Sequence, residues 1–180
     1  VPPPLGTLDE ESHVIRLGSF SKLLAPGLRL GWLLSGSERV SELLRAGSLD
    51  SGGGPNHLTS MIVHRLAAEG GVDRNLEVIG PAYAERAEAL VEALREVLPR
   101  GSQFDSPTGG FFLWVRLPDR FDTRELLARA EGLGVSFAPG ARFGMPGAPQ
   151  PVNAMRLAFC GYSPAELQVG AQRLGRALQD

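Results

Sequence analysis

Apolar and polar residues alternate in blocks along the chain, and the period of the pattern changes from one block to the next. Residues 13–18 and 28–35 are short, largely apolar runs typical of β-strands, separated by a turn-rich segment at 19–27. The second run is almost continuously apolar, so we expect it inside a sheet that is covered on both faces. Ser37 is then placed to cap a helix that reaches about Ala46.

Helical spacing dominates the middle of the chain. After a glycine-rich loop at 51–56, apolar residues from Leu58 onward recur at helical intervals, and Asp73 opens a longer amphipathic pattern that continues to Leu94. Pro81 lies inside that pattern, so we expect the long helix to be kinked or divided there. We place a domain boundary within this helix.

The spacing of apolar residues changes again after Pro99, where strand-like and helix-like segments alternate. Strand patterns occupy 110–117, 135–138 and 153–160, with a glycine- and proline-rich loop at 139–151. Two helix starts are marked by capping signals, Asp122 with Glu125 and Ser163-Pro164 with Glu166. This alternation of strands and helices predicts an α/β or α+β fold.

The amino-acid composition argues against several classes of function for this chain. With 180 residues, 43% hydrophobic and 21% charged, the chain has the makeup of a globular protein, and its net charge of −2 gives no sign of a nucleic-acid or membrane partner. The longest apolar runs, such as 111–115, are too short to span a bilayer. Three scattered histidines and the single Cys160 lack metal-site spacing and allow no internal disulfide, which fits an intracellular, cytoplasmic location.

Lys22 is the only lysine in the chain, beside 17 arginines. A general preference for arginine explains the 17 arginines but leaves open why one lysine persists at this position. Arginine stays protonated and cannot act as a nucleophile, whereas an amine can. A position that needs an amine and a lysine that survived by chance are both compatible with composition alone.

The turn between the first two predicted strands gathers polar chemistry. The run from Ser19 to Arg29 carries two hydroxyls, an amine and a guanidinium, contributed by Ser19, Ser21, Lys22 and Arg29. Hydroxyls and a guanidinium suit a phosphate, and a nearby lysine suits a carbonyl with which it can form a Schiff base. The alternative is an ordinary surface turn with solvated polar groups.

Arg156 stands out in the last predicted strand. Alternation on a strand places it on the same side as Ala154, Ala158 and Cys160, all small, while residues 155, 157 and 159 form an apolar opposite side. A guanidinium among small neighbours has room to meet a ligand. An arginine that merely emerges at a strand edge is the other interpretation.

The segment Ser19-Phe20-Ser21-Lys22 followed by Pro26-Gly27-Leu28-Arg29-Leu30-Gly31 resembles the cofactor-lysine motif of class I and II aminotransferases of fold type I. The resemblance implies that Lys22 forms the Schiff base with pyridoxal 5'-phosphate and that Ser19, Ser21 and Arg29 bind its phosphate. It also implies that Arg156, followed by Leu-Ala-Phe, grips the substrate α-carboxylate.

The resemblance extends over essentially the whole chain, and it is strongest to 2-aminoadipate and aromatic aminotransferases. It implies that 1–75 is the end of the large cofactor-binding α/β domain and that 76–180 is the small C-terminal α+β domain. It also implies amino-group transfer between an L-amino acid and a 2-oxo acid, in a homodimer. Family members are roughly twice this length, and the chain opens Val-Pro-Pro-Pro without a methionine, so we expect a C-terminal fragment.

Two other interpretations stay open. Some bacterial transcription regulators carry an aminotransferase-like effector domain, whose lysine and arginine motifs look the same. A truncated product without activity is the third possibility. The half of the family fold that supplies the groups around the pyridine ring has no counterpart in this sequence, so we expect the isolated chain to be an incomplete enzyme.

Overall fold

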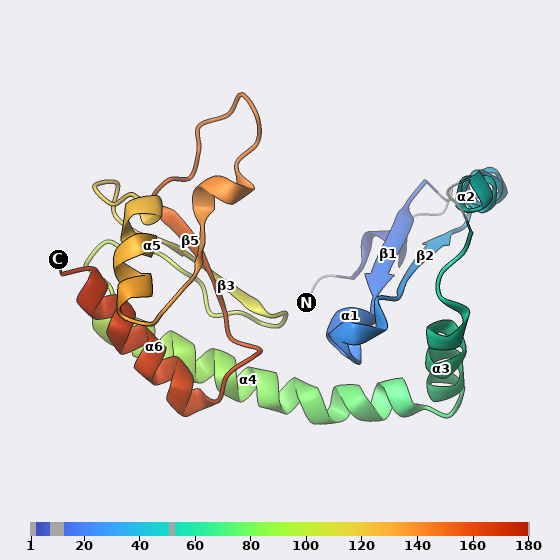
Figure 1. Cartoon of the computed structure of the whole chain (residues 1–180), viewed down its shortest axis with the longest axis horizontal. Helices are drawn as coiled ribbons and strands as arrows, with labels where there is room; N and C mark the ends of the chain where they lie inside the picture. Colours follow the sequence, from blue (N-terminus) through green and yellow to red (C-terminus); the bar gives the residue numbers. More distant parts are fainter. Residues whose placement is uncertain (1–2, 8–12, 51–52, 180) are drawn as a thin grey trace. The chain divides into compact units, whose positions relative to one another are not determined.

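The computed structural model describes residues 3–7, 13–50 and 53–179, which divide into two units, Val1–Ile79 and Gly80–Asp180. Figure 1 labels most helices and strands of both units, and each unit is described by itself. The predicted division into domains at 75/76 stays a prediction. No helix of the described residues combines the length and the apolarity needed to cross a membrane.

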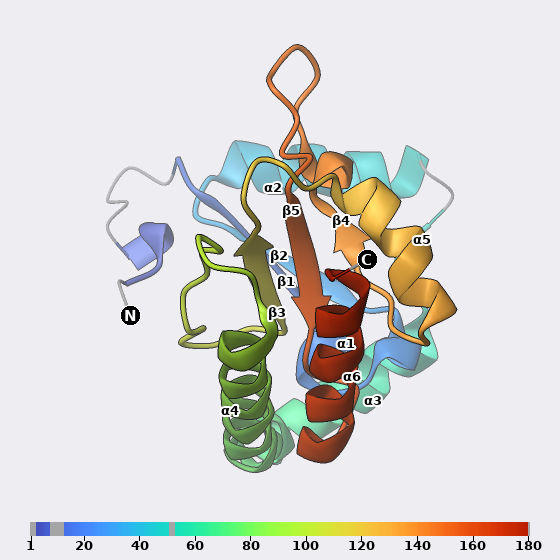
Figure 2. The ribbon, with the colours of Figure 1, turned by 90° about the vertical axis from the view of Figure 1, so that its left-hand side faces the viewer.

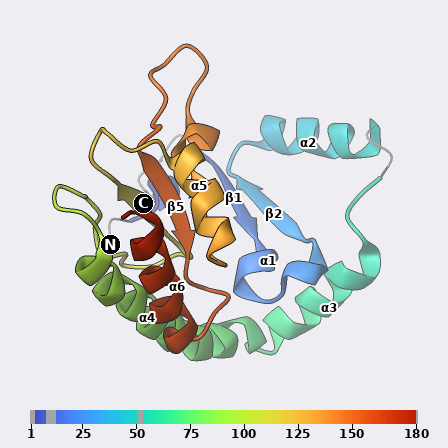
Figure 3. The same cartoon turned by 60° about the vertical axis from the view of Figure 1, so that its left-hand side comes forward.

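A two-stranded antiparallel ribbon is the sheet of the first unit. Strand β1 (Ile15–Ser19) pairs with β2 (Gly31–Ser35), and Gly18 lies opposite Trp32. The chain connects them through the short helix α1 (Phe20–Leu23) and a 3-10 turn at Pro26–Leu28, at one end of the ribbon (Figure 3). The predicted strand at 28–35 is therefore shorter than expected, because the 3-10 turn delays strand pairing until Gly31.

The run 28–35 is predicted to lie in a sheet that is covered on both faces in the complete fold, most of which this chain does not supply, and in the described residues the strand is accordingly exposed. In β2 the side chains of Trp32, Leu33 and Leu34 are all exposed, and β1 is its only paired neighbour. A continuous apolar run is compatible with a doubly covered strand, but the covering layers must come from elsewhere in the chain. The helices α2 (Glu38–Asp50) and α3 (His57–Ala68) follow in this unit.

Helix α4 runs without interruption from Gly71 to Val97. Of the two outcomes predicted at Pro81, a kink or a division, division is wrong, since the helix continues through it. Proline cannot donate to the carbonyl four residues earlier, so the helix loses one backbone hydrogen bond at this position. Pro81 is exposed, and apolar residues at helical spacing continue on both sides of it.

The second unit is built on a three-stranded antiparallel sheet in the order β3-β5-β4, with β3 at Phe112–Arg116, β4 at Ala138–Pro139 and β5 at Ala154–Ala158. The predicted strand at 135–138 is displaced to Ala138–Pro139, and the predicted loop after it begins with a 3-10 helix, Gly140–Phe143. Helices α4, α5 (Thr123–Gly132) and α6 (Pro164–Ala177) cover one face of this sheet (Figures 1 and 2).

A continuous apolar core lies between that sheet face and the helices. Leu113 and Val115 of β3 and Met155 and Leu157 of β5 project into it, together with side chains of α4, α5 and α6. The predicted helix starts are confirmed. Asp122 caps α5, and the side chains and backbones of Ser163 and Glu166 form a complete capping box at α6.

Candidate functional site

The turn after β1 holds three of the predicted site residues, Ser19, Ser21 and Lys22, within one short helix and its cap. Ser19 is the N-cap of α1, and its Oγ accepts a hydrogen bond from the backbone N–H of Ser21 at 3.2 Å. This cap fixes where the helix begins, so Ser21 and Lys22 follow it in the first turn. The Ser19 hydroxyl can still donate its own proton to a ligand.

Lys22 is exposed, and its amine has no hydrogen bond or ion pair with any other described residue. The backbone around it is nevertheless held in place. Asn75, in the first turns of α4, donates from Nδ2 to the carbonyl of Leu23 at 2.5 Å. The structure thus presents the only lysine of the sequence on an anchored turn, with its amine available.

Arg29 ends the same turn in an unusual backbone conformation. Its φ is 49°, in the left-handed region, and it is the sole non-glycine residue with positive φ among those described. L-residues adopt this region at a cost of about 1–3 kcal/mol unless the surroundings impose it. A guanidinium at a position where glycine would be less strained favours a ligand-binding role. Among the described residues, the hydrogen bond of this side chain is a long one of 3.5 Å to the Pro26 carbonyl.

Trp32 packs across the ribbon onto Gly18, immediately before the cap. A Cβ placed on Gly18 would lie 2.0 Å from the indole, so only glycine fits opposite this side chain. The pairing fixes the indole beside the strand end at which the turn begins. Sequence reasoning did not identify Trp32 as part of this neighbourhood.

Arg156 lies in the middle of β5, the central strand of the second unit. It is opposite Trp114 of β3 on one side and Ala138 of β4 on the other. The predicted alternation is confirmed, since Met155 and Leu157 are buried in the core and Arg156 is only partly buried. The guanidinium therefore lies on the sheet face opposite the helices.

The prediction that Arg156 has only small neighbours is wrong. Its Cζ lies 4.0 Å from the ring centroid of Phe112 and 4.5 Å from that of Phe143. Trp114 in turn contacts Phe143 edge to face, with centroids 5.5 Å apart. The small residues are neighbours along β5, whereas these aromatic rings come from β3 and from the turn after β4. The alternation of Phe112 and Trp114 on one strand face was the signal in the sequence.

The structure therefore places the predicted site residues in two groups. Ser19, Ser21, Lys22 and Arg29 share one turn of the first unit, and Arg156 lies on the sheet of the second. Hydrogen bonds from Arg124 lower the pKa of Asp122 to about 2, and hydrogen bonds from Ser163 lower the pKa of Glu166.

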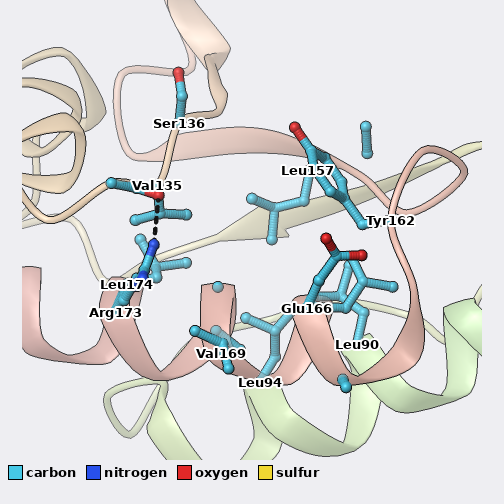
Figure 4. Close-up of a pocket in the computed structure, with 16 residues that line it drawn as sticks. Leu90, Leu94, Val135, Ser136, Leu157, Tyr162, Glu166, Val169, Arg173 and Leu174 are labelled. Atoms are coloured by element: carbon cyan, nitrogen blue, oxygen red, sulfur yellow. Dashed lines mark hydrogen bonds between the residues drawn. The ribbon is translucent and has the colours of Figure 1, made fainter.

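A pocket of about 530 Å³ lies beside α6, on the core side of β5 (Figure 4). Its lining is largely apolar, with Leu90, Leu94 and Leu157 among the side chains that face it. The charged groups at its rim already have partners, because Arg173 donates to the Gly134 carbonyl and Glu166 accepts from Ser163. None of the predicted site residues lines this pocket.

Within the described part of the chain, no cluster of three or more histidine, cysteine, aspartate or glutamate side chains could hold a metal ion. The chemistry available at the candidate site is that of an amine, hydroxyls and guanidinium groups. Such groups hold anions and attack carbonyl carbons.

Known proteins with similar sequences and folds give this chemistry a context. The family model "Aminotransferase class I and II" matches residues 2–174. Aromatic-amino-acid aminotransferase 1 of Thermococcus litoralis is 34% identical over 179 residues, which are 98% of this chain and 42% of that protein. The transcriptional regulator TauR of Rhodobacter capsulatus is also 34% identical, over 98% of this chain and 36% of the regulator.

The fold comparison agrees. The crystal structure of alpha-aminoadipate aminotransferase from Thermus thermophilus, complexed with N-(5'-phosphopyridoxyl)-L-leucine, has a TM-score of 0.86 and 34% identity, over 97% of this chain and 44% of that one. The chain thus spans less than half the length of these relatives and has the fold of the corresponding part of a type I aminotransferase. It belongs to the class I and II aminotransferase family.

Proposed function

We propose that this chain is part of a pyridoxal-phosphate-dependent aminotransferase that moves an amino group between an L-amino acid and a 2-oxo acid. The observation that carries the proposal is the turn between β1 and β2. It combines an exposed amine without a protein partner among the described residues, Lys22, with the hydroxyls of Ser19 and Ser21 and the guanidinium of Arg29.

The donor set of this turn suits the cofactor. Ser19, Ser21 and Arg29 supply neutral and charged donors for a phosphate, and Lys22 supplies the nucleophile for an aldehyde. When bound, the cofactor withdraws electrons from the bonds at the substrate α-carbon. Lys22 then has the second task of moving a proton to and from that carbon.

Arg156 is the proposed group for the substrate α-carboxylate. A guanidinium presents parallel N–H donors that match the two oxygens of a carboxylate. In the described residues its N–H groups have no acceptor, so this capacity is unused within the protein. The identity of the substrate side chain is left open between aromatic and aminoadipate-like amino acids.

Three finer features belong to the same proposal. We place residues 1–75 in the large cofactor-binding domain and residues 76–180 in the small domain. The complete enzyme acts as a homodimer. It works in the cytoplasm, where a chain with one cysteine needs no disulfide.

Borohydride reduction of the complete, cofactor-loaded protein tests the role of Lys22. Reduction should fix the cofactor to the peptide that contains Lys22, detected by its mass and absorbance. In a Lys22→Arg variant, which keeps the charge but lacks a nucleophilic amine, the covalent label should be absent and turnover should fall by about 10²–10⁴-fold or more. A label on another residue in the unmodified protein would refute the assignment.

A second candidate is the effector domain of a transcription regulator, favoured by the similarity to TauR. In this candidate Lys22 and Arg156 bind the cofactor and an amino acid as signals. The two functions separate in one assay. An aminotransferase converts a 2-oxo acid into an amino acid over many turnovers, whereas a sensor binds its ligands without net conversion and the protein that contains it binds a specific DNA site.

A further inference from the structure

The two aromatic rings that flank Arg156 come from opposite sides of its strand. Phe112 belongs to β3, where it is the diagonal cross-strand neighbour of Arg156. Phe143 ends the 3-10 helix that follows β4, on the other side of β5. We propose that Phe112 and Phe143 form a clamp that fixes the Arg156 guanidinium for in-plane binding of the substrate carboxylate. This inference rests on the proposed role of Arg156.

Two aromatic rings present their faces to the guanidinium carbon of Arg156. The Arg156 Cζ lies over both rings, at 4.0 Å from the centroid of Phe112 and 4.5 Å from that of Phe143. A cation above an aromatic face is attracted by the negative potential of the ring. The rings offer no acceptor to the N–H edge, and no hydrogen bond or ion pair of this side chain to any described residue is present. The N–H edge of the Arg156 guanidinium is therefore free to bind an anion.

The clamp itself is braced. Trp114 meets Phe143 at an interplanar angle of 83° with centroids 5.5 Å apart, the edge-to-face arrangement that aromatic pairs favour. The start of the 3-10 helix is equally confined, because a Cβ on Gly140 would lie 2.3 Å from the Pro151 carbonyl oxygen. After Phe143, Gln150 donates from Nε2 to the carbonyls of Met145 and Ala148 at 3.1 Å and closes the loop.

Such bracing matters because a free arginine side chain has many rotamers. A carboxylate that binds to a mobile arginine must also immobilise it, and that ordering reduces affinity. Two rings packed against the guanidinium restrict it before the ligand arrives. We therefore assign Phe112 and Phe143 as positioning residues, with Trp114 supporting Phe143.

The test uses the complete, cofactor-loaded protein and a non-reacting pair of probes, 3-phenylpropionate and its uncharged amide. In Phe112→Leu and in Phe143→Leu, the Kd of the carboxylate should rise by about 3- to 10-fold, and the Kd of the amide should stay within twofold. KM for amino acid substrates should rise more than kcat falls. Phe143→Tyr, which keeps the ring, should restore the carboxylate affinity.

Phe121→Leu is the matched control, because it removes an equivalent contact with another arginine, Arg120, whose Cζ lies 4.7 Å from the Phe121 centroid. This variant should leave both Kd values unchanged. Thermal unfolding of each variant reports any general loss of structure, and the probe pair still separates it from positioning, since a general loss weakens both probes.

Equal weakening of carboxylate and amide would overturn the proposal, because the rings would then contact the ligand directly or support the fold alone. If Arg156→Ala weakens the carboxylate while both Phe→Leu variants bind it normally, the positioning role fails and the proposed function stands. If Arg156→Ala itself leaves the Kd of the carboxylate unchanged, the proposed role of Arg156 is refuted. The positioning role of the two phenylalanines, which rests on it, is then refuted as well.

Discussion

The two units of this chain use similar elements but bury them to very different degrees. In the second unit, three helices cover one face of the β3-β5-β4 sheet, and the core contains residues of the sheet and of all three helices. In the first unit, Leu30 and Val63 are the buried apolar residues among those described, while most of the leucines of β1, β2 and α2 are exposed. Amphipathic elements alone therefore do not make a core, because each apolar face needs a facing layer.

The contrast extends to the candidate site residues. Arg156 is partly buried and held between two rings, on a strand whose other face is completely packed. Lys22 is exposed on a turn that is anchored mainly through backbone hydrogen bonds. The second unit thus presents Arg156 on a strand whose other face is packed, whereas the first unit presents Lys22 on a lightly packed turn.

Core truncation should separate the two units most strongly. Leu94 is fully buried at 0% exposure, so Leu94→Ala should lower the free energy of unfolding by about 2–5 kcal/mol. The same change at Leu43, which is 66% exposed on α2, should stay within about 0.5 kcal/mol. Urea unfolding followed by circular dichroism measures both. Similar losses at the two positions would mean that Leu43 has a covering layer under the conditions of the measurement.

Helix capping should give a smaller difference. Ser163→Ala removes the hydroxyl that accepts from the Glu166 backbone N–H and donates to the Glu166 carboxylate, and it should cost about 0.5–2 kcal/mol in the second unit. Asn56 caps α3 through its side-chain oxygen alone, so Asn56→Ala should cost no more than that. Ser163→Asn, which keeps an acceptor at the cap, is the control in the same urea experiment. A cost at Asn56 well above that at Ser163 would contradict the expectation that helix capping contributes more in the second unit.

The smallest expected effect is in the acid range. The Arg124 guanidinium and backbone hold the pKa of Asp122 at about 2, below its usual 3.8. Because the folded pKa is the lower one, this carboxylate stabilises the folded state above pH 3.8 and loses that contribution as the pH falls toward 2. The thermal unfolding midpoint of the Asp122→Asn variant should therefore change less with pH over this interval than that of the unmodified chain. Glu166, whose pKa is also lowered, shifts stability in the same direction. An unchanged slope in Asp122→Asn would exclude this carboxylate as a source of acid sensitivity.

Much of the second unit was predictable because its signals are local. Ser163, Pro164 and Glu166 occupy cap positions that have one good structural solution, and alternation along 153–160 correctly separated the core side from the side that carries Arg156. Only the division predicted at Pro81 is wrong, because one lost hydrogen bond does not outweigh the apolar spacing that continues on both sides of it. The exposure of β2 could not be read from its own residues, since coverage depends on layers supplied by other segments.

The candidate site was predictable only where its residues are close in sequence. The run from Ser19 to Arg29 carries its own motif, and the structure keeps these residues on one turn. The clamp around Arg156 depends on the register of β3 against β5 and on a 3-10 helix after β4, neither of which the pattern specifies. Phe143 is 13 residues from Arg156 in the sequence and becomes its neighbour only through tertiary structure.

The placement of the two tryptophans has an optical consequence. Trp32 packs on Gly18 beside the lysine turn, and Trp114 contacts Phe143 beside Arg156, so each candidate group has one indole close to it. In a Trp114→Phe variant the remaining emission would come from Trp32 and would follow events at the lysine turn. In a Trp32→Phe variant it would come from Trp114 and would follow the arginine. The molecule thus contains two separable fluorescent reporters, one for each half of its proposed chemistry.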